Sequence, residues 1–109
     1  MKPSRSEFLE IRGRRLHIRR WGRDDAPLLV LLHGWCDVSA SWQFVVDALA
    51  GDWNIVAPDW RGFGLSQWND DVYWFPDYIA DLDAILFHYA PDEPVRLVGH
   101  SLGGNAACI

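Results

Sequence analysis

The chain opens with alternating apolar and polar residues and continues with short apolar runs separated by stretches of helical spacing. Residues 8–11 and 14–21 have the period of two strands, joined at Gly13, whose freedom at positive φ suits a tight turn. Residues 28–32 are uniformly apolar, which is typical of a strand buried on both faces of a parallel sheet. Residues 54–57 and 95–98 have the same character and predict two further strands.

Two stretches between these strands predict helices. Ser41 is expected to cap the first helix, whose inner face would be formed by Trp42, Val45, Val46 and Leu49 before a stop at Gly51. Pro76 suits the first turn of the second helix, and Asp77, Asp81 and Asp83 follow near the positive end of its dipole. The apolar face of that helix comprises Tyr78, Ile79, Leu82, Ile85, Leu86 and Tyr89.

Two leading strands followed by alternating strands and helices predict an α/β fold with a mostly parallel sheet and helices on both faces. The 109 residues suffice for a single domain, 1–109. In such sheets ligands bind beyond the carboxyl ends of the strands, so chemistry is expected there.

Composition and charge restrict the classes of partner expected for this chain. Half of the residues are hydrophobic and the net charge is −5, which excludes a disordered chain and argues against a nucleic-acid partner. Residues 1–23 hold eight basic and two acidic side chains, whereas the remainder holds two basic and thirteen acidic ones. The basic residues are expected to protect an exposed edge strand, with binding of an anionic surface as the alternative.

Neither a membrane segment nor a metal or cofactor site is predicted. The longest apolar run, 26–32, is far shorter than the roughly 20 residues that span a bilayer, and no signal-peptide core is present. Two cysteines form no disulfide framework, which favours a cytoplasmic location, and Cys36 is expected to be a buried structural thiol. The four histidines lack metal-ligand spacing, and no phosphate-binding glycine loop occurs.

The strand 95–98 leads directly into Gly99-His100-Ser101-Leu102-Gly103, which fits the G-x-S-x-G pattern of a nucleophile elbow. The flanking Gly99 and Gly103 allow strand and helix to approach closely around a strained serine. Because the motif follows a buried strand and precedes small residues, Ser101 is the candidate catalytic nucleophile.

Two further loops complete a pattern. His33-Gly34-Trp35 follows the strand 28–32, and Asp59-Trp60-Arg61-Gly62-Phe63-Gly64-Leu65-Ser66 follows the strand 54–57. Together with the elbow, these loops resemble those of the α/β-hydrolase family, in the family's order. The resemblance implies the first five strands of an eight-stranded sheet. It also implies an oxyanion hole formed by the backbone N–H groups of Trp35 and Leu102, with His33 and Gly34 as structural parts of the motif. Asp59 and Arg61 are interpreted as structural residues that shape their loop.

A serine at the elbow is similar to the esterases, thioesterases, lipases and amidases of this family. It speaks against its epoxide hydrolases and haloalkane dehalogenases, which use aspartate there. The resemblance therefore implies cleavage of a small ester or related acyl substrate through an acyl-enzyme on Ser101. The His-Gly-X form argues against the His-Gly-Gly-Gly lipases. An acyltransferase on the same scaffold is an open alternative.

The family orders its triad as serine, acid and histidine. Eight residues follow Ser101, and none is His, Asp or Glu, so the acid and the base are expected outside this chain, which would be an apparently truncated domain. His17, His33, His88 and His100 are not expected to substitute. A second alternative is a catalytically incomplete fragment that binds a partner, or a second copy, through an open sheet edge at strand 95–98.

Aromatic residues cluster between the strand 54–57 and the second helix. Trp60 and Phe63 have two open interpretations, core packing or the lining of an apolar substrate pocket. Ordinary packing is expected for Trp68, Tyr73, Trp74 and Phe75.

Overall fold

The N-terminal alternation folds as an antiparallel hairpin. In the computed structural model, which describes residues 1–109, β1 (Ser4–Ile11) pairs along its whole length with β2 (Arg14–Gly22). The turn between them places Arg12 and Gly13 at φ 49° and 79°, as the sequence predicts for the glycine. β1 begins four residues before the expected strand, because backbone pairing with β2 continues through the polar residues Ser4–Glu7.

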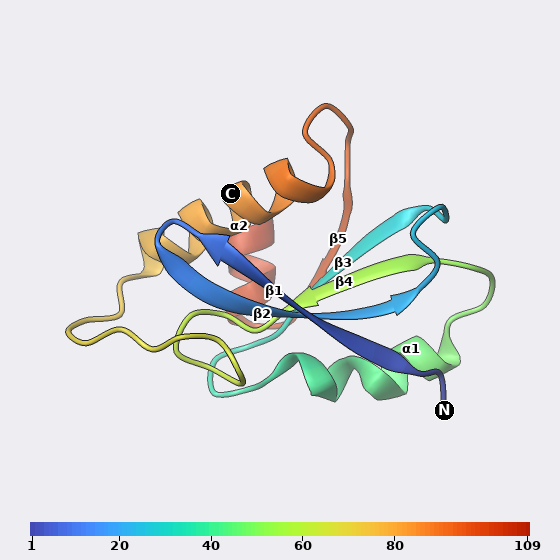
Figure 1. Cartoon of the computed structure of the whole chain (residues 1–109), viewed down its shortest axis with the longest axis horizontal. Coiled ribbons are helices and arrows are strands. Elements are labelled where there is room, and N and C mark those ends of the chain that lie inside the picture. Colours follow the sequence, from blue (N-terminus) through green and yellow to red (C-terminus); the bar gives the residue numbers. More distant parts are fainter.

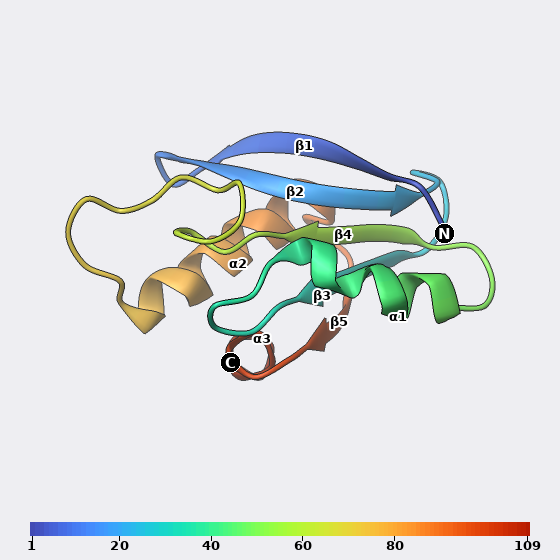
Figure 2. The same ribbon diagram turned by 90° about the horizontal axis from the view of Figure 1, so that it is seen from below.

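The three apolar runs form the parallel part of the sheet. β3 (Leu28–Leu32) lies between β4 (Asn54–Pro58) and β5 (Arg96–Gly99) and is parallel to both, while β2 joins β4 in antiparallel orientation. The resulting order, β1-β2-β4-β3-β5, leaves β1 at one edge and β5 at the other (Figure 2). The expectation that the basic residues protect an edge strand is wrong for four of the eight, because Arg14, Arg15, Arg19 and Arg20 lie on β2, which is paired on both sides. The prediction of a five-stranded α/β sheet is confirmed, and its C-terminal part, β4-β3-β5, is parallel.

One face of the sheet is covered by η1 (Ser39–Trp42) and α1 (Gln43–Ala48), where Val46 packs on Leu29, Leu31, Ile55 and Ala57. The predicted helix start at Ser41 is wrong: the chain enters a 3₁₀ turn at Ser39, and the Ser41 hydroxyl donates to Asp37 at 2.6 Å. The predicted inner position of Val45 is also wrong, because its side chain is 42% exposed. The helix is only six residues long and Val46 is its one buried residue, while Trp42 and Leu49, which flank it, pack against the same cluster.

The opposite face is covered by α2 (Phe75–Tyr89) and α3 (Leu102–Ala107), so the two helical layers sandwich the sheet (Figures 1 and 2). Pro76 occupies the first turn of α2, as predicted. Tyr78, Leu82 and Ala106 pack with Val30 and Val56 in the larger core cluster. No helix of the protein combines the length and the apolar character needed to cross a membrane, and no group of three His, Cys, Asp or Glu side chains is placed to hold a metal ion.

Candidate active site

The three motif loops meet at one end of the sheet, because each follows the carboxyl end of a parallel strand. Gly34, after β3, and Ser101, after β5, are in contact. A Cβ atom built on Gly34 would lie 3.3 Å from the Cβ of Ser101 and 3.0 Å from Nδ1 of His100. The small residue at position 34 therefore lets the loop after β3 approach the serine directly.

Ser101 is held in a strained backbone conformation. Its φ of 54° and ψ of −112° lie outside the regions that a residue with a side chain normally adopts. The N–H of His100 donates to the carbonyl of Leu32 at 3.0 Å, and the N–H of Gly103 donates to the carbonyl of His100 at 3.0 Å. These bonds fix a sharp strand-to-helix turn, and the serine at its apex is exposed.

Gly99 and Gly103 are required by close packing around this turn. A Cβ on Gly99 would lie 2.5 Å from the carbonyl atoms of Gly103, and a Cβ on Gly103 would collide with the carbonyl of Leu32. Any larger residue would push α3 away from β3 and β5.

His33 is buried and orients the peptide that follows it. Its Nε2 accepts from the N–H of Trp60 at 3.1 Å, so Nδ1 carries the proton and donates to the carbonyl of Gly34 at 2.7 Å. Burial lowers the pKa of His33, and hydrogen bonding and nearby carboxylates oppose this only in part, so the neutral ring is favoured. The carbonyl of Gly34 and the N–H of Trp35 belong to the same peptide group, and in a trans peptide these two groups point in opposite directions. The hydrogen bond from His33 to the Gly34 carbonyl therefore directs the N–H of Trp35 away from His33. That N–H donates no hydrogen bond within the chain.

Asp59 holds the loop 59–66, which follows β4, through several hydrogen bonds. It accepts hydrogen bonds from the N–H groups of Ser39 and Leu65, at 2.6 and 3.1 Å, and contacts Nδ1 of His17 at 2.7 Å. Burial alone would raise the pKa of Asp59, but these hydrogen bonds outweigh it and hold the pKa below its usual value. Asp59 therefore joins the hairpin, η1 and the loop 59–66, in keeping with the structural role expected for it.

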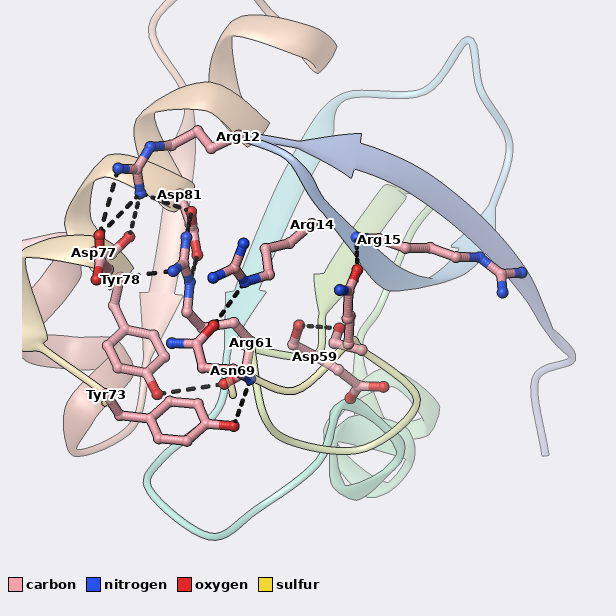
Figure 3. A network of polar contacts seen from close by, with 12 residues as sticks. Arg12, Arg14, Arg15, Asp59, Arg61, Asn69, Tyr73, Asp77, Tyr78 and Asp81 are labelled. Atoms are coloured by element: carbon pink, nitrogen blue, oxygen red, sulfur yellow. Dashed lines mark hydrogen bonds and ion pairs between the residues drawn. The ribbon is translucent and has the colours of Figure 1, made fainter. Parts of the chain in front are cut away.

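Arg61 of the same loop forms a buried ion pair with α2. Its Nε and one terminal nitrogen donate to the two carboxylate oxygens of Asp81 at 2.6 and 2.7 Å, and Arg12 of the hairpin turn reaches Asp81 at 3.1 Å (Figure 3). The carboxylate, chiefly through these hydrogen bonds, raises the pKa of Arg61. The expectation that Asp81 lies near the positive end of the helix dipole is wrong, because only Asp77 falls in the first turn of α2, and Asp81 is instead buried against Arg61.

None of the four histidines forms a hydrogen bond with Ser101. Both ring nitrogens of His17 are occupied, by Asp59 and by the hydroxyl of Ser6 at 2.8 Å, and both of His33 are occupied as described above. His88 lies in the last turn of α2, and His100 is exposed beside the serine.

The structure contradicts the burial expected for Cys36 and the packing expected for Trp68, Tyr73 and Trp74, and it decides between the two interpretations left open for Trp60. Cys36 is exposed rather than buried, since the tight turn after Trp35 places it at φ 58° on the surface. Trp68 and Trp74 are 70% and 64% exposed, so core packing does not account for them. Trp60 is fully buried, and its indole N–H donates to the carbonyl of His33 at 2.8 Å, which settles its role as packing.

Ser101 opens into a hollow of about 600 Å³ whose other lining residues are Trp35, Phe75, Leu102, Asn105, Cys108 and Ile109. A second hollow of about 290 Å³ is lined by Trp35, Gly62, Phe63, Trp68 and Tyr73. Trp35 lines both, so its indole stands between the serine and a group of aromatic side chains. No sequence signal short of the fold would have shown this adjacency.

Comparison with known proteins agrees with this architecture. The sequence model of the α/β hydrolase fold family matches residues 27–109. The chain belongs to this family. A serine hydrolase-like protein of Danio rerio is 34% identical over 110 residues, which cover 98% of this chain and 33% of the relative. Epoxide hydrolase 1 of Caenorhabditis elegans is 30% identical over 104 residues, which cover 94% of this chain and 26% of the relative.

Solved structures of the family superpose well. A thioesterase domain from the curacin biosynthetic pathway has a TM-score of 0.88 at 31% identity, over 96% of this chain and 38% of that one. A haloalkane dehalogenase loop variant from Bradyrhizobium elkanii has a TM-score of 0.85 at 29% identity, over 95% of this chain and 34% of that one. The chain thus spans about a third of these proteins, whose names describe several kinds of hydrolase.

Proposed function

We propose that the chain carries the nucleophile and the oxyanion-binding loop of a serine hydrolase that cleaves a small ester or related acyl substrate. The observation that carries this proposal is the strained, exposed Ser101 at the end of β5, with the loop at Gly34 pressed against it. A folded chain maintains such a backbone only where the surrounding structure holds it, and strain of this kind gathers at reactive sites.

The proposed reaction uses Ser101 as attacking group. Its Oγ adds to the carbonyl carbon, a general base takes the hydroxyl proton, and the negative charge develops on the former carbonyl oxygen. The N–H of Trp35, aimed by the His33–Gly34 hydrogen bond, and the N–H of Leu102, which begins α3 and has no acceptor one turn earlier in the helix, would stabilise that oxygen. Collapse expels the alcohol and leaves an acyl-enzyme, which water then hydrolyses.

The acid and the base of the triad are proposed to follow Ile109 in sequence, in the family's order. This proposal accords with the share of the relatives that the chain covers, 33% of the Danio rerio protein and 38% of the thioesterase domain. It also accords with the histidines, because those of the chain that are buried have both nitrogens engaged elsewhere.

Serine at the elbow favours acyl chemistry over the other hydrolytic reactions named among the relatives. A serine hydroxyl attacks carbonyl carbon once a base removes its proton, and the resulting oxyanion needs the donors that Trp35 and Leu102 offer. The epoxide hydrolases and haloalkane dehalogenases that this fold resembles use an aspartate at this position, where the present chain has Ser101.

The test is covalent labelling of the product of the complete gene with a fluorophosphonate probe, followed by peptide mapping. We expect one adduct at Ser101, lost in Ser101→Ala and in heat-denatured protein. Ser4→Ala, which removes an exposed serine of β1, is the matched control and should label normally. Labelling that persists in Ser101→Ala, or folded protein that is never labelled, contradicts the proposal.

A further inference from the structure

The second hollow, which we name the aromatic subsite, is formed by Trp35, Gly62, Phe63, Trp68 and Tyr73. It borders the hollow that contains Ser101, since Trp35 lines both. The ring centroids of Trp35 and Phe63 are 4.9 Å apart and the two ring planes make an angle of 76°. These two walls of the aromatic subsite are therefore nearly at right angles. Such walls offer a bound ring both a face and an edge.

Specific contacts hold the lining residues of the aromatic subsite in place. Gly62 has no Cβ where the ring of Tyr73 packs; an added Cβ would lie 2.6 Å from the Tyr73 hydroxyl. That hydroxyl accepts from the N–H of Asn69 at 2.9 Å, and Arg14 of β2 holds the Asn69 side chain at 2.7 Å (Figure 3). The neighbouring Arg61 is fixed by Asp81. Tyr73 is therefore held by a polar contact to Asn69, the residue that follows Trp68, and both aromatic side chains are exposed rather than part of the hydrophobic core.

Size and charge select the occupant. An apolar cavity of about 150 Å³ is sufficient for benzene, so a hollow of about 290 Å³ accommodates one substituted ring. No charged side chain lines the subsite, and Asp70 and Asp71 follow Trp68 closely in the same loop. An anionic group would lose its hydration there without gaining a cationic partner.

We propose that the aromatic subsite binds an uncharged aromatic group of the substrate whose acyl carbon reacts at Ser101. This inference rests on the proposed function for the identity of the reacting bond, but the binding of the ring depends only on the five lining residues. It assigns the exposed Trp68 a role in substrate selection, which neither core packing nor catalysis gives it.

The test uses the product of the complete gene and three probes of similar size: 2-phenylethanol, 2-cyclohexylethanol and phenylacetate. Binding is followed by the shifts of the tryptophan indole N–H resonances. We expect 2-phenylethanol to shift the resonances of Trp35 and Trp68 and to bind about 2- to 12-fold more tightly than the cyclohexyl probe. Phenylacetate should bind most weakly, because of its charge.

Trp68→Ala should weaken the binding of 2-phenylethanol roughly tenfold and abolish its advantage over 2-cyclohexylethanol. Trp74→Ala is the matched control, since Trp74 is a comparably exposed tryptophan of the same segment that lines neither hollow. Equal affinities for the two alcohols, tighter binding of phenylacetate, or normal binding by Trp68→Ala overturns the proposal. Ser101→Ala should bind all three probes normally, so a failure of the labelling experiment leaves this result standing, and the reverse also holds.

Discussion

Replacing Asp81 by alanine should be among the most destabilising single changes in this protein. The Asp81 carboxylate accepts two hydrogen bonds from Arg61, at 2.6 and 2.7 Å, and both side chains are almost completely buried. Arginine remains protonated under all ordinary conditions, and here its pKa is raised further. Asp81→Ala therefore leaves a buried cation with only Asp77, 3.7 Å away, as a neighbouring carboxylate.

The magnitude follows from burial. Loss of one partner from a buried ion pair costs about 3–5 kcal/mol, and the residual attraction of Asp77 places the expected loss near 3 kcal/mol. Arg12 also reaches Asp81, but its side chain is 40% exposed, so Arg12→Ala should cost at most about 1 kcal/mol. Replacing both partners, as Arg61→Met with Asp81→Leu, should cost less than Asp81→Ala alone, because no unpaired charge then remains buried.

The measurement is urea unfolding followed by tryptophan fluorescence and by circular dichroism. Asp83→Ala is the matched control: Asp83 is an exposed carboxylate of the same helix, and its loss should change stability by no more than about 0.5 kcal/mol. The reasoning is refuted if Asp81→Ala lies within 1 kcal/mol of the wild-type chain, or if the double replacement is more destabilising than the single one.

Two further predictions concern the loops at the candidate active site. Ser101→Gly should have a free energy of unfolding about 0.5–2 kcal/mol higher than that of Ser101→Ala, measured by urea unfolding. Glycine relieves backbone strain of about 1–3 kcal/mol at φ 54°, and the greater entropy of its unfolded chain offsets part of this gain. Equal free energies of unfolding would contradict the strain. Because the pKa of His33 is lowered in the folded chain, the unfolded chain takes up this proton at a higher pH than the folded chain does. The stability that the neutral His33 contributes is therefore fully present above pH 6.5 and is lost as the pH falls below that value. The contribution of this one group cannot exceed about 1.4 kcal/mol per pH unit. Urea unfolding across pH 5–8 should show a flatter profile for His33→Gln and an unchanged one for His88→Gln, a substitution of an exposed histidine; a His33→Gln profile as steep as the wild type would refute the assignment.

Local rules succeeded where the determining interactions are local. The apolar run of β3 was predicted to the residue, because five consecutive apolar side chains can be accommodated only with both faces of the strand covered. The start of α2 was predicted from Pro76, whose fixed φ and missing N–H suit a first turn. The start of the preceding helix was not, because Asp37 accepts the Ser41 hydroxyl that would otherwise cap it.

Distant contacts account for the remaining differences. Helical spacing could not show that Asp81 meets Arg61, because that contact depends on how α2 crosses the loop after β4. For the same reason composition alone suggested ordinary packing for Trp68, whereas in the fold its side chain is exposed and lines the same hollow as Trp35.

The sequence by itself determined the order of strands and helices and the strained turn at Ser101, since each depends on residue types within a few positions of one another. Only the tertiary structure decided that Gly34 touches Ser101, that the peptide after it is turned by His33, and that Trp35 separates the serine from an aromatic hollow. These relations arise because β3 lies between β4 and β5, which brings the ends of three strands, far apart along the chain, to one edge of the sheet.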